Sequence, residues 1–144
     1  MSDKYYESIR SKILDNEIVK KVKDYSKNRS DLDTYLFVGK TLSEAGKHYG
    51  EGIIKKYSIK LIKEFGKRYS TRLLYKTLKF YNYVSSLKVP TVSANLTWSH
   101  YDELLSINDN DVINYYISIC INNNLSVREL RQRIKNKEYE RLDE

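Results

Sequence analysis

The stretch IIKKYSIKLIKEFGKRYSTRLLYKTLKFYNYV, residues 53–84, decides the fold of this chain. Apolar residues recur every three or four positions on both sides of Gly66, which is the pattern of two amphipathic helices. Gly66 suits the end of the first helix, and Ser70 suits the start of the second, because a serine oxygen accepts hydrogen bonds from free N–H groups there. The sequence therefore predicts a helix over 53–65, a turn, and a helix from 71 to about 85, the order of a helix-turn-helix.

Positive charge is concentrated in the same stretch. Between residues 53 and 79 one acidic residue, Glu64, stands against nine basic residues, which gives +8, more than the +7 of the whole chain. The basic residues are Lys55, Lys56, Lys60, Lys63, Lys67, Arg68, Arg72, Lys76 and Lys79. A solvated basic face on a helical bundle is the ordinary explanation of such a run. The positions of the basic residues around the helix must therefore distinguish it from a nucleic-acid contact.

The second predicted helix places basic and apolar residues on different faces. Its basic ridge is spaced i, i+4, i+7 and i+11, which keeps the side chains within roughly 60° of one another; it consists of Arg72, Lys76, Lys79 and the terminal aromatic Tyr83. The opposite side carries Leu74, Leu78 and Tyr81, flanked by Leu73, Phe80 and Val84. A recognition helix in the major groove needs this division, because cations bind phosphates and arginine reads guanine edges. Ser70 and Thr71, at the helix start, are expected to add phosphate contacts.

Helical spacing continues on the N-terminal side of this stretch. A first helix is predicted over 4–25, with a buried stripe of Leu14, Ile18, Val22 and Tyr25. Asn28-Arg29-Ser30 is expected to break it. A second helix is predicted from about 31 to 47, with a stripe of Tyr35, Val38, Leu42 and Ala45, followed by a turn at Gly46, Gly50 and Gly52.

The second half of the chain, beyond Val89-Pro90, reads as three shorter helices. Ser99 is expected to cap a helix that contains Tyr101, Leu104 and Leu105, and Asn108-Asp109 begins a second helix that carries Val112, Tyr116, Ile119 and Cys120 toward a core. Ser126 and Glu129 form a capping-box pattern that opens a last helix through Lys135. No strand-like alternation is long enough for a sheet, so the predicted fold class is all-α with about seven helices.

Composition restricts the kind of protein. At 144 residues, 40% hydrophobic and 31% charged, the chain suits one soluble domain or two small helical subdomains. It has no apolar run of membrane-spanning length and no signal sequence, so we expect no membrane contact and a cytoplasmic location, with nucleoid association as one form of it. One cysteine excludes an internal disulfide and fits a reducing compartment. The basic balance favours a polyanionic partner.

A second basic site lies on the last predicted helix. It consists of Arg128, Arg131, Arg133 and Lys135, in which Arg128 and Arg131 are one turn apart and can touch a backbone together. Ordinary surface charge explains this pattern equally well. The stretch from 98 to 111 is acidic and is expected to support the basic elements rather than to face DNA; its carboxylates are Asp102, Glu103, Asp109 and Asp111.

Three phrases resemble a known family. EFGKRYSTRLLYKTLKFY, NLTWSHYDELL and NNNLSVRELRQRIKNKEYERL are similar to the N-terminal domain of the YhcG family, bacterial proteins in which this domain precedes a PD-(D/E)XK nuclease domain. The resemblance extends from Tyr5 to Leu142. Where that family usually has FGKGFS or FGRGFS, this chain has Arg68 and Tyr69, which adds charge and leaves the turn conformation open. The stretches 96–100 and 125–129 also resemble, more distantly, landmarks of the helix-turn-helix domain of the ParB and KorB partition proteins.

The resemblance implies DNA binding without a nuclease site in this chain. A PD-(D/E)XK nuclease needs acidic metal ligands and a nearby lysine, usually as Glu-x-Lys, and the sequence contains no Glu-x-Lys, Asp-x-Lys or Gln-x-Lys. Two readings stay open: an isolated domain, or a short relative without a nuclease. We therefore expect no enzymatic activity of its own.

Residues that suggest other chemistry have simpler explanations. His48, His100 and Cys120 are too few and too scattered for a zinc site, so no metal or cofactor is expected. Ser99 beside His100 is no catalytic pair, because neighbouring helix residues point in different directions and no third group orients them. Trp98 is expected in the core, and most of the fourteen tyrosines fall on apolar stripes, which weakens a single-stranded stacking hypothesis.

The sequence thus predicts a ParB-like helical DNA-binding module. Residues 1–50 form a helical hairpin suited to dimerisation, and 51–144 carry the helix-turn-helix and a C-terminal helical subdomain. The predicted DNA contacts are Lys67, Arg68, Ser70, Thr71, Arg72, Tyr75, Lys76, Lys79, Tyr83, Arg128 and Arg131. The expected partners are DNA, a second copy of the chain, and a nuclease domain or protein. The alternative is a protein-interaction module that assembles with a nuclease partner.

Overall fold

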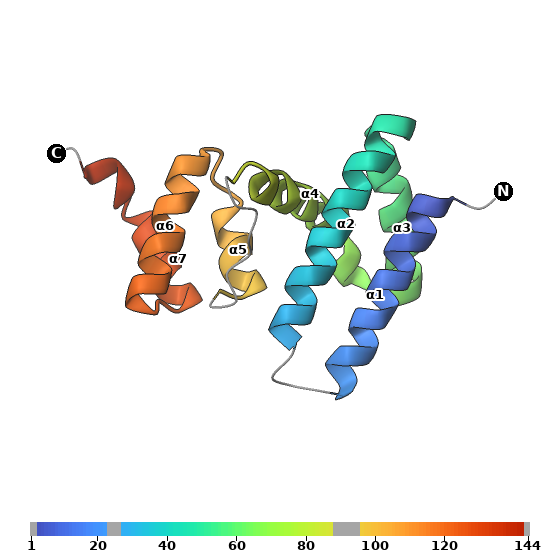
Figure 1. The fold of residues 1–144 in the computed structure, drawn as a ribbon, viewed down its shortest axis with the longest axis horizontal. Helices are drawn as coiled ribbons and strands as arrows, with labels where there is room; N and C mark the ends of the chain where they lie inside the picture. Colours follow the sequence, from blue (N-terminus) through green and yellow to red (C-terminus); the bar gives the residue numbers. More distant parts are fainter. Residues whose placement is uncertain (1–2, 23–26, 88–95, 143–144) are drawn as a thin grey trace. The chain divides into compact units, whose positions relative to one another are not determined.

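The fold consists of helices (Figure 1). The structure, a computed structural model, describes residues 3–22, 27–87 and 96–142, and these contain no strand. The elements are α1 (Lys4–Val22), α2 (Lys27–Tyr49), α3 (Ile53–Phe65), the 3-10 turn η1 (Lys67–Tyr69), α4 (Thr71–Ser85), α5 (Trp98–Leu104), α6 (Asn110–Asn123), α7 (Val127–Lys135) and the 3-10 turn η2 (Tyr139–Arg141). The all-helical prediction is confirmed.

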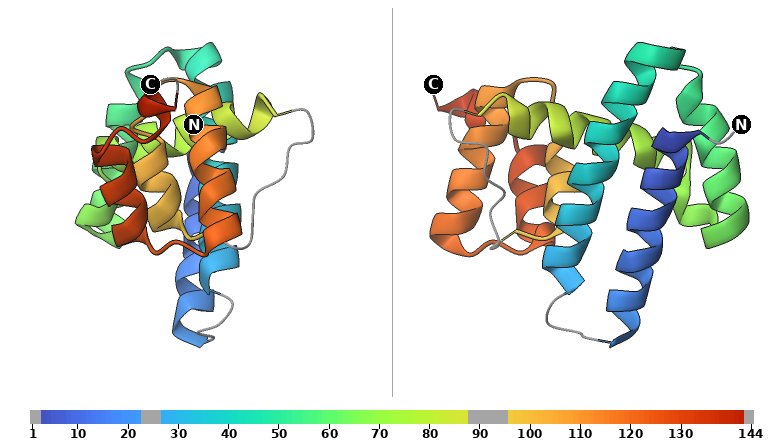
Figure 2. Two further views of the ribbon diagram at one scale, coloured as in Figure 1. Left: turned by 90° about the vertical axis from the view of Figure 1, so that its left-hand side faces the viewer. Right: turned by 45° about the vertical axis from the view of Figure 1, so that its right-hand side comes forward.

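The helices form two compact units, Met1–Val92 and Ser93–Glu144. In the first unit α1 and α2 run antiparallel side by side, and α4 runs across α2 (Figure 2). The predicted functional boundary at residue 50 lies inside this unit, whereas the predicted end of the helical section at Val89-Pro90 lies outside the described residues. None of the described helices combines the length and apolar character needed to cross a membrane.

The buried stripe of α1 differs from the predicted one. Tyr6, Ile9 and Ile13 are buried, whereas Leu14 is 39% and Ile18 54% exposed. The predicted stripe missed the buried position after Ile13 because that position is Asn16, a polar residue. Asn16 is 1% exposed and is satisfied within the core: it donates to the Asp31 carboxylate at 2.9 Å and accepts from the Ser30 hydroxyl. The Val22 side chain and Tyr25 lie outside the described residues.

The start of α2 also differs from the prediction. Asn28-Arg29-Ser30 does not break the chain; it lies in the first turn of α2, which begins at Lys27. The first N–H groups of a helix have no partner inside the helix, so a polar triplet is as typical of a helix start as of a break. The predicted stripe of α2 is confirmed: Tyr35, Val38, Leu42 and Ala45 are all buried.

A glycine sets the contact between α2 and α4. A Cβ atom added at Gly39 would lie 2.0 Å from the carbonyl oxygen of Thr77 and 2.9 Å from the Cβ of Tyr81. The backbones of the two helices therefore approach each other more closely than any other residue would allow. Thr77 is fully buried at this crossing, with its hydroxyl donating to the Leu74 carbonyl at 2.7 Å. This contact fixes which side of α4 faces the core.

The second unit has its own apolar core, contributed by Leu96, Tyr101, Leu104, Leu105, Val112, Ile113, Tyr116, Cys120, Leu125 and Leu130. The cap of α5 is Thr97, whose hydroxyl accepts from the His100 N–H at 3.3 Å, so the predicted cap at Ser99 is wrong. The other predicted boundaries are confirmed: Asp109 caps α6, and the Ser126–Glu129 capping box opens α7. Asn124 ends α6 with a left-handed φ of 50°, which asparagine tolerates.

Candidate nucleic-acid interface

Two residues build the turn between α3 and α4, as predicted. Gly66 has a φ of 113°, a region that favours glycine, and its N–H donates to the Ile62 carbonyl at 2.9 Å. The Ser70 hydroxyl accepts from the Leu73 N–H at 3.3 Å and so caps α4. The helix-turn-helix order is therefore encoded by short-range chemistry, and it fixes where the basic residues of α4 begin.

Tyr69 anchors the turn to the core. It is 1% exposed, its hydroxyl donates to the Glu17 carboxylate at 2.6 Å, and its carbonyl accepts from the Ser58 hydroxyl at 2.8 Å. Burial and the hydrogen bond to Glu17 both raise the pKa of the Tyr69 hydroxyl. Where the resembling family has Phe, this chain buries a tyrosine and supplies a partner for its hydroxyl from α1. The turn is therefore ordered despite the departure from the usual motif.

The outer side of α4 presents cations and one aromatic ring. Arg72 and Lys79 are exposed, and Tyr75, between them on the same side of the helix, is 39% exposed. Thr71, at the helix start, is also exposed, whereas Ser70 is half-buried because its side chain serves as the cap. We call Thr71, Arg72, Tyr75 and Lys79 the α4 surface. Four of the predicted contacts are thus brought together on one exposed side.

Two other predicted contacts on α4 lie elsewhere. Tyr83 is 5% exposed, so its prediction as the end of an exposed ridge is wrong, and Lys76 is half-buried at the margin. The predicted core side was centred on Leu74, Leu78 and Tyr81. The close approach at Gly39 turns Thr77 to the centre instead. Tyr83 lies about 120° around the helix from Thr77 and is buried at the edge of that side. The basic ridge is therefore shorter than predicted.

Tyr75 is held at the edge of a shallow groove. Its hydroxyl donates to the Glu51 carboxylate at 3.0 Å, and the groove is lined in addition by Lys47, Leu78 and Asn82. This hydrogen bond and burial raise the pKa of the Tyr75 hydroxyl. Sequence reasoning missed Glu51, although its position between two glycines marks a turn that brings the end of α2 next to α4.

The turn adds two exposed cations beside α4. Lys67 and Arg68 are both exposed, and the Arg68 guanidinium lies 5.5 Å from the centre of the buried Tyr35 ring. This cation–π contact holds the Arg68 guanidinium near the ring. Glu64, the acidic residue of the basic stretch, forms a bidentate pair with Arg10 of α1 at 2.5 and 2.8 Å. The negative charge of Glu64 is thereby balanced by Arg10, a residue of the same unit.

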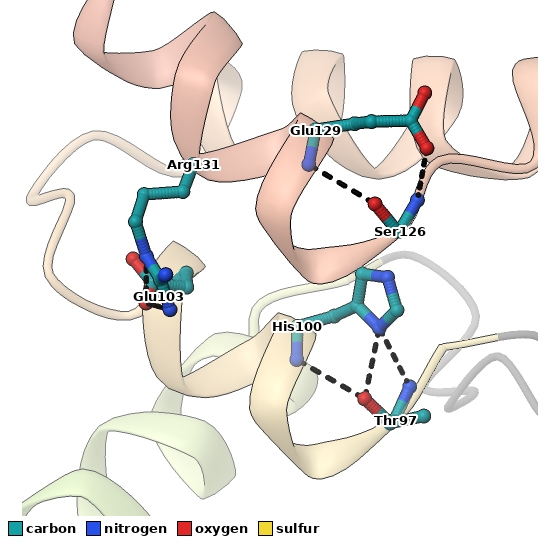
Figure 3. A network of polar contacts seen from close by, with 6 residues as sticks. All are labelled: Thr97, His100, Glu103, Ser126, Glu129 and Arg131. Atoms are coloured by element: carbon teal, nitrogen blue, oxygen red, sulfur yellow. Dashed lines mark hydrogen bonds and ion pairs between the residues drawn. The ribbon is translucent and has the colours of Figure 1, made fainter.

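In the second unit, Arg131 pairs with the acidic stretch (Figure 3). Its guanidinium donates two hydrogen bonds to the Glu103 carboxylate, at 2.7 and 2.9 Å, which raise the pKa of Arg131. Arg128, three residues earlier on α7, is exposed. The acidic stretch was expected to support the basic helix, and the ion pair between Glu103 and Arg131 is one contact of this kind. Both arginines stay predicted DNA contacts.

The start of α5 and the start of α7 are fixed by two similar caps (Figure 3). The Ser126 hydroxyl accepts from the Glu129 N–H while the Glu129 carboxylate accepts from the Ser126 N–H, both at 3.1 Å, which lowers the pKa of Glu129. In the other cap, the His100 Nδ1 atom lies 3.1 Å from the Thr97 backbone nitrogen. The His100 Nε2 atom lies 2.9 Å from the Leu125 carbonyl oxygen. His100 therefore joins α5 to the segment before α7 and has a packing role.

The described residues contain no group of three or more His, Cys, Asp or Glu side chains that could hold a metal ion. Cys120 is buried, and burial raises the pKa of its thiol to about 11. Trp98, predicted in the core, is half-buried at the start of α5.

A comparison with known protein families identifies one match. The DUF1016 N-terminal domain matches residues 10–141, almost the whole chain. No curated protein and no solved structure matches the chain significantly. The matched domain is the one that the resemblance to the YhcG family indicated, whereas the likeness to ParB and KorB stays a prediction. The chain therefore belongs to the family of the DUF1016 N-terminal domain, the N-terminal domain of YhcG proteins.

Proposed function

We propose that this domain binds double-stranded DNA through its helix-turn-helix, with α4 as the recognition helix. The observation that carries the proposal is the α4 surface: exposed Arg72, Tyr75 and Lys79 on a helix whose other side is packed against α2 at Thr77. A rigid helix with cations on its outer side matches the electrostatic and steric demands of the major groove.

Each exposed residue has a chemical role in this proposal. Arg72, in the first turn of α4, is placed as N-terminal residues of recognition helices are, and its guanidinium can bond two acceptors of a guanine. Lys79 and Lys67 bind phosphates as point charges. Thr71 donates its hydroxyl, and the Arg68 guanidinium moves from the Tyr35 ring to the DNA backbone beside the turn. The hydroxyl of Tyr75 stays on Glu51 while its ring packs against a sugar or base.

The family membership suggests what the binding is for. In the YhcG proteins that this chain resembles, the domain precedes a PD-(D/E)XK nuclease domain. The function of the domain would therefore be to bring DNA to a nuclease, without catalysis of its own. The absence of Glu-x-Lys from the sequence is consistent with this division of labour.

The test is a salt-titrated binding assay with a fluorescent DNA duplex. The double variant Arg72→Ala/Lys79→Ala removes two exposed cations of the α4 surface. We expect binding on the order of 10- to 100-fold weaker and a salt slope smaller by roughly two, because two phosphate or base contacts are lost. Circular dichroism checks that this double variant is as fully folded as the parent protein.

The matched control is Lys21→Ala/Lys40→Ala. It removes the same charge from exposed side chains of α1 and α2. We expect less than about a threefold effect, because exposed charges outside the α4 surface contribute only through a screened field. An equal loss in both double variants would contradict the assignment of the contact to α4.

A second candidate function, assembly with another protein chain, is favoured by one observation. Leu14 and Ile18, one turn apart on α1, expose 39% and 54% of their surface. Apolar side chains grouped in this way often mark a contact with a partner. We expect a dimer in sedimentation velocity that Ile18→Lys reduces to a monomer; a parent protein that is monomeric with and without DNA would contradict the dimer.

A further inference from the structure

Three aromatic rings meet where α1 begins and α2 ends. The ring centres of Tyr5 and Tyr49 are 6.0 Å apart, those of His48 and Tyr49 4.6 Å, and those of Tyr5 and His48 6.1 Å. We call these three residues the aromatic cluster. Tyr49 is 52% exposed, His48 is exposed and Tyr5 is half-buried, so much of the ring surface faces solvent.

The backbone beneath the aromatic cluster is anchored on both helices. Gly50, with a φ of 87°, ends α2 directly after Tyr49, and its N–H donates to the Gly46 carbonyl at 2.8 Å. Asp3 caps α1 by accepting from two backbone N–H groups and also accepts from the Tyr57 hydroxyl at 2.6 Å. Because the rings also rest against one another, a ligand that contacts them has little ordering cost to overcome.

Both a cation and carboxylates lie near the aromatic cluster. The Lys4 ammonium is 5.3 Å from the centre of the Tyr5 ring. Lys47 directly precedes His48 in the sequence, but it lines the groove beside Tyr75. Among the carboxylates, Glu7 follows Tyr5 by two residues on α1, and Glu44 lies about one turn before His48 on α2. The charge is therefore mixed, and the distinctive property of this surface is the set of rings together with the Lys4 cation against one of them.

We propose that the aromatic cluster binds the unpaired bases of single-stranded DNA, with Lys4 contacting a flanking phosphate. Exposed aromatic rings with neighbouring cations are the pairing that sequence-tolerant single-strand sites use, because every base has a π face. None of these residues belongs to the α4 surface, so the site goes beyond the duplex contact proposed above. A domain with both sites would favour DNA ends and junctions, where duplex and single strand meet.

The experiment measures anisotropy of a labelled ten-nucleotide oligo-dT with the full chain. We expect Tyr49→Ala to weaken binding about tenfold or more, and His48→Ala to act in the same direction, because each removes a stacking ring. Tyr49→Phe keeps the ring and should bind as the parent does. Since Tyr49 is an exposed last residue of α2, its variants should keep the parent's thermal unfolding midpoint.

Two controls separate stacking from charge and from the duplex site. An abasic ten-phosphate oligonucleotide should bind at least about tenfold more weakly than oligo-dT, because it keeps the phosphates and lacks the bases. Tyr75→Ala removes an exposed ring from the α4 surface and should leave oligo-dT binding unchanged. Equal affinity for abasic and oligo-dT probes, or unchanged oligo-dT binding in folded Tyr49→Ala and His48→Ala, would overturn the proposal.

The two proposals fail separately. Loss of duplex binding in Arg72→Ala/Lys79→Ala with oligo-dT binding intact supports two sites. A parent protein that binds oligo-dT but no duplex refutes the α4 proposal and leaves the aromatic cluster standing. A parent protein that binds duplex but no oligo-dT refutes the aromatic cluster alone.

Discussion

Tyr69 shows how one residue that departs from a family motif is accommodated. A phenylalanine would fill the same buried position without needing a polar partner. A tyrosine hydroxyl buried without a hydrogen-bond partner would lower the stability of the folded protein by about 1–3 kcal/mol. Glu17, half-buried on α1, accepts that hydrogen bond at 2.6 Å. The sequence alone shows the substitution but not its partner, because the two residues are 52 positions apart and only the packing of α1 on the turn brings them together.

Cys120 allows a prediction about reactivity. Burial raises the pKa of its thiol from an ordinary value of 9.0 to about 11. At pH 8 the thiolate fraction falls by about 100-fold, and the thiolate is the reactive form. Modification by Ellman's reagent at pH 8 should therefore be at least about 100-fold slower in the folded protein than in urea. Folded and unfolded rates within a few-fold of each other would contradict a buried Cys120.

The same shift has a consequence for stability at high pH. The folded state keeps the thiol proton to a higher pH than the unfolded chain does, so the unfolded chain ionises first. The contribution of Cys120 to stability is therefore complete below about pH 9 and decreases as the pH rises toward 11.

At the scale of single helices, short-range chemistry made α3, η1 and α4 predictable. Gly66 and Ser70 mark the turn through their own backbone conformation and side-chain oxygen, so the predicted bounds agree with the structure. The α1 stripe was mispredicted because Asn16 is buried through partners on α2, which no pattern on α1 reveals. The exposure of Arg72 and Lys79 was predicted correctly, whereas the burial of Tyr83 was not, because it depends on packing that no pattern on α4 reveals.

Gly39 and Gly46, both in α2, allow a matched test of that helix contact. Gly39→Ala would place its Cβ 2.0 Å from the Thr77 carbonyl oxygen, so the helices must separate, at a cost of about 1–3 kcal/mol or more. Gly46→Ala meets nothing within 4 Å and should stabilise the protein by about 0.5–1 kcal/mol through helix propensity. Urea unfolding followed by circular dichroism measures both. A neutral Gly39→Ala would contradict the close packing of α4 on α2.

At the scale of the whole molecule, the net charge of +7 conceals an uneven distribution. The stretch 53–79 carries the excess of basic residues, while α5 and the start of α6 are acidic, and α5 engages α7 through Glu103 and Arg131. Composition predicts a polyanionic partner, but it does not show which cations are engaged within the protein. The pairs Arg10–Glu64 and Arg131–Glu103 became visible only in the fold, because each joins residues far apart in the sequence.

The Arg131–Glu103 pair leads to different expectations for the two arginines of α7. Arg128 is exposed, so its contact with a phosphate would be made without breaking the Arg131–Glu103 pair; Arg131 would first have to leave Glu103. If the second unit touches duplex DNA, Arg128→Ala should lower the slope of log affinity against log salt by about one, and Arg131→Ala by clearly less. Glu103→Gln, which releases Arg131, should strengthen duplex binding. Slopes that are the same in all three variants and the parent would mean that the second unit does not contact DNA and that binding rests on the first unit alone.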